Sequence, residues 1–224
     1  MRTDEVHQET MAGRAHLVTA GESAPVRSTF EVRIHGRGGQ GVVTAAELLS
    51  VAAFNEGRWA QAFPSFGSER TGAPVVAFCR ISEREIRTHE PVLAPDALII
   101  QDATLIHQVD LFSGVTADTY ILLNTAGSFD DLGLGEFVAG FRHDHLLTVP
   151  ATELAMRHIG RPVPNAVLLG GFAGMTGVVS EESVVAAIRQ RFAGPLAEGN
   201  VAAAREAFRY VTDEEKELER AAPD

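Results

Sequence analysis

Residues 31–49, EVRIHGRGGQGVVTAAELL, decide the fold of this chain. Apolar Val32 and Ile34 alternate with polar neighbours, which is the period of a β-strand. A loop crowded with glycine follows, and after it Ala and Leu residues recur at the spacing of an α-helix. A strand, a glycine-rich turn and a helix in this order predict the first unit of an α/β fold.

The glycine-rich turn matches the pattern G-x-G-x-x-G and comprises Gly36, Arg37, Gly38, Gly39, Gln40 and Gly41. The N–H groups at the start of the following helix could receive an anion. Arg37 could contact such an anion with two donors, and Gln40 offers an amide. A dinucleotide site also expects an acidic residue about 20 positions further on, yet GRWAQAFPSFG, residues 57–67, contains none. Ligand contact, packing or subunit docking, and nucleotide binding therefore all remain open.

The rest of the chain continues the α/β pattern. Strands are predicted over residues 58–63, 74–81, 96–103, 118–125 and 145–151, the last three with room for helices between them. Helical patterns follow over residues 151–160, 164–177, 180–194 and 196–214, with Ser180 as an N-cap. We therefore predict a Rossmann-like, open and mostly parallel sheet with a helical C-terminal third.

The domain organisation predicted from these patterns is simple. Residues 1–28 show no sustained period and are predicted to be a mobile tail, or an arm that orders on a partner. Residues 29–212 form one domain, and residues 213–224 are predicted to be a solvated helix end. No apolar stretch approaches the ~20 residues that span a bilayer, and the N-terminus lacks the apolar core of a secretory signal, so we expect a cytoplasmic protein without a membrane partner.

Charge and cysteine content exclude two classes of function. The formal net charge of −11 would repel phosphate backbones, which argues against nucleic-acid binding. Cys79 is the single cysteine, so the chain can form neither an internal disulfide nor a cysteine-ligated iron–sulfur cluster. Its apolar surroundings predict a small buried side chain.

Two further segments, taken together with the glycine turn, form a pattern that is more specific than G-x-G-x-x-G alone. They are AFPSFGSERTGAPVVAFCRIS, residues 62–82, and RPVPNAVLLGGFAG, residues 161–174. Together with GRGGQGVVTAAELLSVAA they resemble the gamma subunit, or the equivalent fused gamma domain, of the 2-oxoacid:ferredoxin oxidoreductases, most closely the pyruvate:ferredoxin oxidoreductase type. The resemblance covers residues 29–212 and implies a Rossmann-like subunit that packs on partners.

The resemblance also implies an activity that belongs to a complex. Such complexes convert a 2-oxoacid and coenzyme A to acyl-CoA and carbon dioxide, with ferredoxin or flavodoxin as electron acceptor. Thiamine diphosphate, Mg²⁺ and iron–sulfur clusters would lie on alpha-, beta- and delta-type partner subunits, and this chain alone would be inactive and bind no cofactor. It contains no G-D-G motif followed by Asn that would hold the diphosphate through a metal.

The candidate ligand or interface loops are the glycine turn and a second loop with Ser65, Gly67, Arg70, Thr71 and Gly72, and no metal site is predicted. The second loop matches the family's second signature, and in the glycine turn all residues except Arg37 match the family motif. Arg70 is the preferred polar contact, since a guanidinium can hold a carboxylate or a phosphate. Two weaker candidates are Asp102, otherwise an N-cap for residues 103–109, and Asn165, otherwise a helix N-cap. The rival functions are a stand-alone NAD(P)-dependent oxidoreductase and a pure scaffold.

Overall fold

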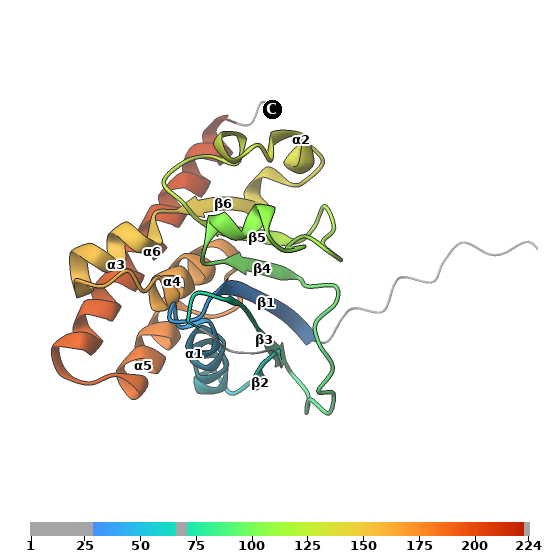
Figure 1. Cartoon of the computed structure of the whole chain (residues 1–224). Helices are drawn as coiled ribbons and strands as arrows, with labels where there is room; N and C mark the ends of the chain where they lie inside the picture. The colour runs from blue at the N-terminus through green and yellow to red at the C-terminus, as the bar shows by residue number, and fades with distance from the viewer. Residues whose placement is uncertain (1–28, 66–70, 222–224) are drawn as a thin grey trace, which may run out of the picture.

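The computed structural model describes residues 29–65 and 71–221, which form one six-stranded sheet covered by helices (Figure 1). The strands are β1 Thr29–Arg37, β2 Trp59–Pro64, β3 Pro74–Ser82, β4 Ala97–Ile100, β5 Tyr120–Asn124 and β6 Leu146–Val149. The α-helices are α1 Val42–Asn55, α2 Gly135–Val138, α3 Ala151–Ile159, α4 Asn165–Thr176, α5 Glu181–Arg191 and α6 Gly194–Ala221. Residues 1–28, for which a tail was predicted, lie outside the described residues.

The sheet is mostly parallel, as the short apolar runs predicted. Its order is β2-β3-β1-β4-β5-β6, and the pairs β1–β4, β4–β5 and β5–β6 are parallel. β3 pairs antiparallel with both β1 and β2, so β3 alone runs against the other strands of this sheet. This strand order resembles that of a doubly wound fold. The difference is β3, which joins the sheet antiparallel to its neighbours instead of through a parallel crossover.

The strand, turn and helix predicted from residues 31–49 are confirmed. Val32 and Ile34 point into the larger core, as do the small and branched residues along one side of α1. Gly41 is the N-cap of α1 and has a left-handed φ of 73°, a conformation that glycine adopts without steric cost. The turn can therefore reverse direction within a few residues and start the helix over the sheet.

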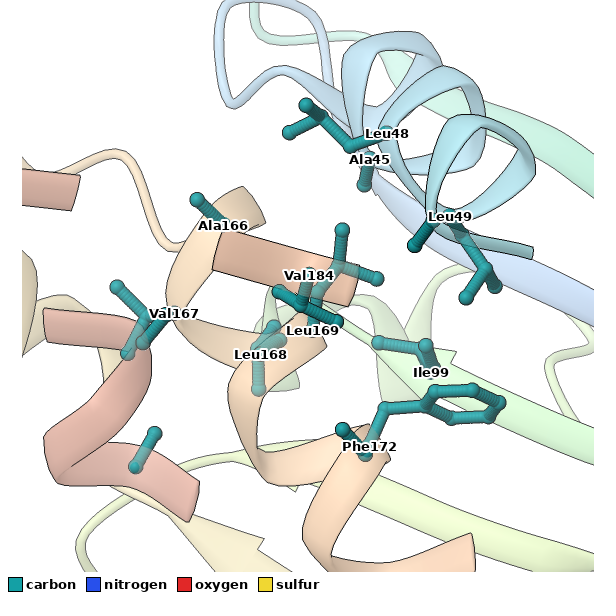
Figure 2. Close-up of a cluster of buried hydrophobic side chains, with 14 of the residues drawn as sticks. Ala45, Leu48, Leu49, Ile99, Ala166, Val167, Leu168, Leu169, Phe172 and Val184 are labelled. Atoms are coloured by element: carbon teal, nitrogen blue, oxygen red, sulfur yellow. The ribbon is translucent and has the colours of Figure 1, made fainter. Parts of the chain in front are cut away.

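The larger core lies between the sheet and the long helices. Figure 2 shows Leu49 of α1, Ile99 of β4 and Phe172 of α4 within one cluster, with Val184 of α5 beside them. α4 is buried on nearly every side, which explains its almost entirely apolar and glycine-rich sequence. The helical C-terminal third is thus the cover of the sheet and not a separate unit.

The last helix is longer than the predicted domain, since α6 continues past residue 212 to Ala221. Gly170 of α4 lies so close to α6 that a methyl group on it would come within 3.0 Å of the carbonyl oxygen of Ala204. Close backbone approach of two helices needs small residues at the contact, and these two helices supply them. No helix in the described part of the chain is long and apolar enough to span a membrane.

The connections between the last three strands, which the spacing left long enough for helices, contain only short helical turns. The segment between β4 and β5 contains only the 3₁₀ turn η1, Ala103–His107. The segment between β5 and β6 contains the 3₁₀ turns η2 Asp130–Leu132 and η3 His143–His145 beside the single-turn α2. Leu105, Leu111 and their apolar neighbours still bury the second face of β4 and β5, so short turns suffice there.

Candidate functional site

The glycine turn lies where the strand order of the sheet reverses. From β1 the chain proceeds to β2 and β3 on one side, and from β4 it proceeds to β5 and β6 on the other. The carboxyl ends of these two neighbouring parallel strands lead into Gly38 and Asp102. Open α/β sheets bind ligands in the crevice at this point, so the turn has the position expected of a site.

Hydrogen bonds within the turn hold its shape. The Arg37 N–H donates to Oε1 of Gln40 at 2.8 Å, and the Gln40 N–H donates to the Arg37 carbonyl at 3.0 Å. Gly36 has no room for a side chain, because a methyl group would lie 2.7 Å from Cγ2 of Val42 and 3.1 Å from Cβ of Gln101. The backbone of β1 therefore lies so close to α1 at Gly36 that no residue with a side chain would fit at this position.

Asp102 joins the turn to the end of β4. It accepts hydrogen bonds from Nε of Arg37 at 3.1 Å and from Nε2 of Gln40 at 2.8 Å. It also caps η1 by accepting from the Thr104 N–H at 3.0 Å, as its N-cap interpretation predicted. Burial alone would raise the pKa of Asp102, but the hydrogen bonds from Thr104 and Gln40 and the charge of Arg37 hold it below its ordinary value. Asp102 thus remains ionised and organises the turn.

Four hydrogen bonds hold the Arg37 guanidinium inside the chain. Besides Asp102, it donates to the Gly72 carbonyl at 3.0 Å, to Oγ1 of Thr104 at 2.7 Å and to Oε1 of Gln108 at 2.9 Å. All three of its nitrogens have partners. The expectation that Arg37 offers two donors to an anion therefore does not fit this geometry, in which Arg37 clamps the turn.

The two signature segments lie side by side. The Gly38 N–H donates to the Ala73 carbonyl at 2.9 Å, and the Gly72 N–H donates to the Gly38 carbonyl at 3.0 Å. Gly38 and Thr71 form an isolated parallel bridge, and the Ser65 N–H donates to the Val76 carbonyl at 2.8 Å. Gly67 and Arg70 lie outside the described residues.

Asn165 contacts the turn instead of capping its helix. It is the first residue of α4, and the N-cap is Pro164, which has no side chain to accept a hydrogen bond. Its Nδ2 donates to the Gly41 carbonyl at 3.5 Å, and its Oδ1 accepts from the Ala166 N–H at 2.7 Å. The N-cap prediction is therefore wrong in position, although Oδ1 still satisfies one helix N–H group.

A cavity of about 300 Å³ opens beside the turn. Its walls are the two signature segments and the first turn of α1, with Arg37, Gly38, Gly39, Gly41, Val42, Val43, Thr44, Thr71 and Val75 as lining residues. Among the described residues no side chain caps α1, so its first N–H groups face this wall as possible donors to an anion. We call this the glycine-turn cavity.

Gln101 is a residue that the sequence-based interpretation did not single out. It follows β4 directly, is 1% exposed, and neither of its side-chain amide atoms has a hydrogen-bond partner in the described part of the chain. A buried amide without partners is costly. The signal in the sequence was a polar residue directly after the apolar run 97–100, since a polar group at the end of a buried strand is costly to bury.

A dinucleotide site does not fit this geometry. None of the described residues that line the glycine-turn cavity is acidic, and residues 71–74, beside the turn at this edge of the sheet, are Thr, Gly, Ala and Pro. Among the described residues, no group of three or more His, Cys, Asp or Glu side chains could hold a metal ion. Cys79 is buried in β3, and desolvation raises the pKa of its thiol.

Fold and site together define a class: a Rossmann-like α/β domain with a glycine-rich turn at the reversal point of its sheet. A family model described as pyruvate ferredoxin/flavodoxin oxidoreductase matches residues 31–210. The chain belongs to the pyruvate ferredoxin/flavodoxin oxidoreductase family, and its counterparts there are gamma-type subunits.

Individual relatives agree with this membership. The chain is 46% identical over 179 residues to pyruvate synthase subunit PorC of Methanothermobacter marburgensis, covering 80% of this chain and 96% of that protein. It is 45% identical over 179 residues to the pyruvate/ketoisovalerate oxidoreductases common subunit gamma of Pyrococcus abyssi, covering 80% of this chain and 95% of that protein.

Solved structures share the fold. The crystal structure of pyruvate oxidoreductase subunit PORC from Thermotoga maritima matches with a TM-score of 0.71 and 32% identity, over 82% of this chain and 97% of that one. A 2-oxoglutarate:ferredoxin oxidoreductase from Magnetococcus marinus, with 2-oxoglutarate, coenzyme A and succinyl-CoA bound, matches with a TM-score of 0.56 and 15% identity, over 88% of this chain and 32% of that one. The resemblance to a gamma subunit and the predicted α/β fold are thereby confirmed.

Proposed function

We propose that this chain is the gamma subunit of a thiamine diphosphate-dependent 2-oxoacid:ferredoxin oxidoreductase complex. The complex would convert a 2-oxoacid such as pyruvate and coenzyme A to acyl-CoA and carbon dioxide, and pass electrons to ferredoxin or flavodoxin. Support comes from relatives named as pyruvate synthase and pyruvate/ketoisovalerate oxidoreductase subunits. The chain would act in the cytoplasm, and alone it would be inactive.

The redox and thiamine chemistry would belong to partner subunits. The single cysteine of the chain cannot ligate a cluster, and it is buried within β3. The described residues also do not fit an Mg²⁺-held diphosphate, because no group of three or more potential metal ligands converges among them. We therefore assign thiamine diphosphate, Mg²⁺ and the clusters to alpha-, beta- and delta-type subunits.

The contribution of this chain would be to close the site around coenzyme A. The observation that carries this proposal is the docking of the two signature segments around the uncapped N-terminus of α1. Helix N–H groups and glycine backbone favour an anionic group such as a phosphate. Arg70, which matches the family's second signature, is the cation that we assign to such a group from the sequence.

A scaffold is the second candidate function, and one observation favours it. Each nitrogen of the Arg37 guanidinium donates a hydrogen bond within the chain, as expected of a purely structural residue. The acceptors belong to Asp102, Gly72, Thr104 and Gln108. The glycine turn would then serve to dock a partner subunit and would touch no substrate.

Kinetics of the assembled complex separate the two candidates. If the cavity contacts coenzyme A, Arg70→Ala raises the KM for coenzyme A roughly tenfold or more, since a hydrogen bond to a charged group contributes about 1.5–3 kcal/mol. Thr71→Val, which removes one hydroxyl from the cavity wall, raises it by a smaller factor. The KM for the 2-oxoacid stays constant in both variants.

The control is Arg87→Ala, because Arg87 is exposed and, among the described residues, its side chain pairs with Glu85 alone, away from the turn. An unchanged KM for coenzyme A in both test variants would leave scaffolding as the function of the turn.

A further inference from the structure

One face of β1, β3 and β2 is covered by a segment without regular structure. Along β3, Cys79 points into the larger core, so Arg80 points to the opposite face of the sheet. Residues 83–96, which contain no helix or strand, lie over that face, and the Glu90 carbonyl accepts a hydrogen bond from Nη2 of Arg80 at 2.6 Å. Figure 1 shows this segment as an irregular trace on the side of the strands away from α3 and α5.

Arg80 is the central residue of this face. It is directly paired in the sheet with Glu31 of β1 and with Gln61 of β2. Its Nε donates to Oε1 of Glu31 at 2.6 Å, and its guanidinium lies 5.2 Å from the ring centroid of Phe63. The residue is 3% exposed.

Two polar atoms on this face lack partners. Nη1 of Arg80 and Oε1 of Gln61 are buried, and neither has a hydrogen-bond partner in the described part of the chain. They belong to directly paired residues, so both unmet groups lie at one place on the face. Because unpartnered buried polar atoms are costly, this place calls for a group from outside the chain.

A hollow of about 380 Å³ opens at Arg80, and we call it the Arg80 hollow. Its other walls are the start of β1, at Thr29 and Glu31, and residues 85–88. The glycine turn follows the other end of β1, roughly 26 Å away at about 3.3 Å per residue. A ligand at the turn therefore does not reach Arg80.

The chemistry of the Arg80 hollow favours a carboxylate. Arg87 also lines it, but its guanidinium pairs with Glu85 at 2.9 Å. Among the described arginines of the hollow, the nitrogen without a partner is thus Nη1 of Arg80. A guanidinium that holds one carboxylate through Nε can hold a second through Nη1, and such charge-assisted hydrogen bonds are strong.

Trp59 favours a protein segment over a free acid as the source of this carboxylate. Trp59 is paired with Ser82, which is paired with Thr29, so it lies about 10 Å from the hollow along the end of the sheet. It shares the face of Phe63, four residues further along β2, and is 54% exposed. Tryptophan and arginine are enriched where proteins contact one another, whereas a small acid in the hollow would leave Trp59 in water.

We propose that this face docks a partner subunit of the oxidoreductase, which inserts an aspartate or glutamate side chain into the Arg80 hollow. The inference rests on the proposed function, since it requires partner subunits. The inserted carboxylate accepts a hydrogen bond from Nη1 of Arg80, and Oε1 of Gln61 accepts one from a backbone N–H of the same segment. Residues 83–96 have no helix or strand to break, so a small shift of this segment opens Nη1 to the partner.

Three substitutions at Thr88 test the sign of the partner's charge. Thr88 lines the hollow and is exposed, so Thr88→Glu, Thr88→Gln and Thr88→Lys differ in charge at similar size. Each tagged full-length chain is purified from its native cell, and the partner subunits recovered per chain are quantified at rising salt concentration. Thr88→Glu recovers at least about fivefold less partner than Thr88→Gln, because like charges meet at the interface. Thr88→Lys recovers at least as much as Thr88→Gln.

The matched control is the same exchange at Ala193, which is exposed between α5 and α6. Ala193→Glu and Ala193→Gln recover equal amounts of partner. Trp59→Ala provides a second test that does not touch the hollow, and it lowers recovery at every salt concentration.

The outcomes separate this inference from the proposed function. If the wild-type chain recovers no partner subunits, the proposed function fails, and the docking inference fails with it. If the wild type recovers partners but the three Thr88 variants recover equal amounts, only the docking inference is overturned, as a free acid in the hollow would predict. Weaker recovery by Thr88→Lys than by Thr88→Glu also overturns it, since the partner would then be basic.

Discussion

Gly41 shows at the scale of one residue how the site is built. Its left-handed φ of 73° starts α1, and its carbonyl accepts a hydrogen bond from Asn165, 124 residues further along the chain. The motif spacing predicts that this position is glycine. The spacing cannot predict that Asn165 fills the space where a side chain would go, because that contact exists only in the folded chain.

Gly41→Ala should lower the free energy of unfolding by about 2 kcal/mol or more, because it adds backbone strain and a clash. A methyl group there would lie within 3.0 Å of Nδ2 of Asn165. Gly39→Ala is the matched control, since Gly39 also has a positive φ, of 98°, but nothing within 4 Å of the added methyl. Urea unfolding of the full chain measures both. Equal losses in the two variants would contradict the close packing of Asn165 on the turn.

The strand pattern did not predict the burial of His35. Alternation along β1 places Arg33 and His35 opposite Val32 and Ile34, which the sequence alone presents as a polar face. That face is covered instead, since the Arg33 guanidinium donates to backbone carbonyls from residues 92–113, and His35 is 5% exposed. Burial and the charge of Arg33 lower the pKa of His35 to about 4, against the opposing effect of Asp110.

This shifted pKa predicts acid sensitivity. The unfolded chain binds a proton at His35 below about pH 6.5, whereas the folded chain does so only near pH 4, so folding stability falls as the pH drops through this window. The loss is at most about 1.4 kcal/mol per pH unit. His35→Gln should flatten this slope in urea unfolding between pH 6.5 and 4. The exposed His143→Gln should not. An unchanged slope in His35→Gln would show that His35 is not buried in neutral form.

At the scale of elements, local signals predicted much of the fold. The unit over residues 31–49 was predictable because both periods and the glycines lie within one short stretch. The N-cap at Ser180 was predictable for the same reason, and its hydroxyl accepts from the Ser183 N–H at 3.2 Å. The connections after β4 and β5 were not, since Leu105 and Leu111 are buried by the sheet face beneath them and not by helical periodicity. Gly114, with a φ of 75°, also interrupts the first of these connections.

The contact between α4 and α6 predicts a large effect of one methyl group. Gly170→Ala should destabilise the chain by about 1–3 kcal/mol through overpacking, despite the better helix propensity of alanine. The cause is the Ala204 carbonyl, which would lie within 3.0 Å of the new methyl. Thermal unfolding gives the change, with Gly140→Ala as control because nothing lies within 4 Å of that position. Wild-type or higher stability of Gly170→Ala would contradict the close approach of the two helices.

At the scale of the whole molecule, the site combines segments far apart in sequence. Recognition of the paired signature segments predicted the family, which the match over residues 31–210 confirms. The motifs did not predict that the Arg37 guanidinium donates hydrogen bonds to Asp102, Gly72 and Gln108, because hydrogen-bond partners depend on which strands become neighbours. Motif reading thus identified the class of protein, and the geometry was needed to separate clamping residues from those available to a ligand.

The central claim is that this chain works as the gamma subunit of a larger oxidoreductase. Affinity purification of the tagged full-length chain from its native cell, followed by size-exclusion chromatography and visible absorption, tests it most directly. We predict co-elution with larger partner subunits in a brown fraction that oxidises a 2-oxoacid with coenzyme A, whereas the separated chain is colourless and inactive. A stable monomer that elutes without cluster-bearing partners would contradict the claim.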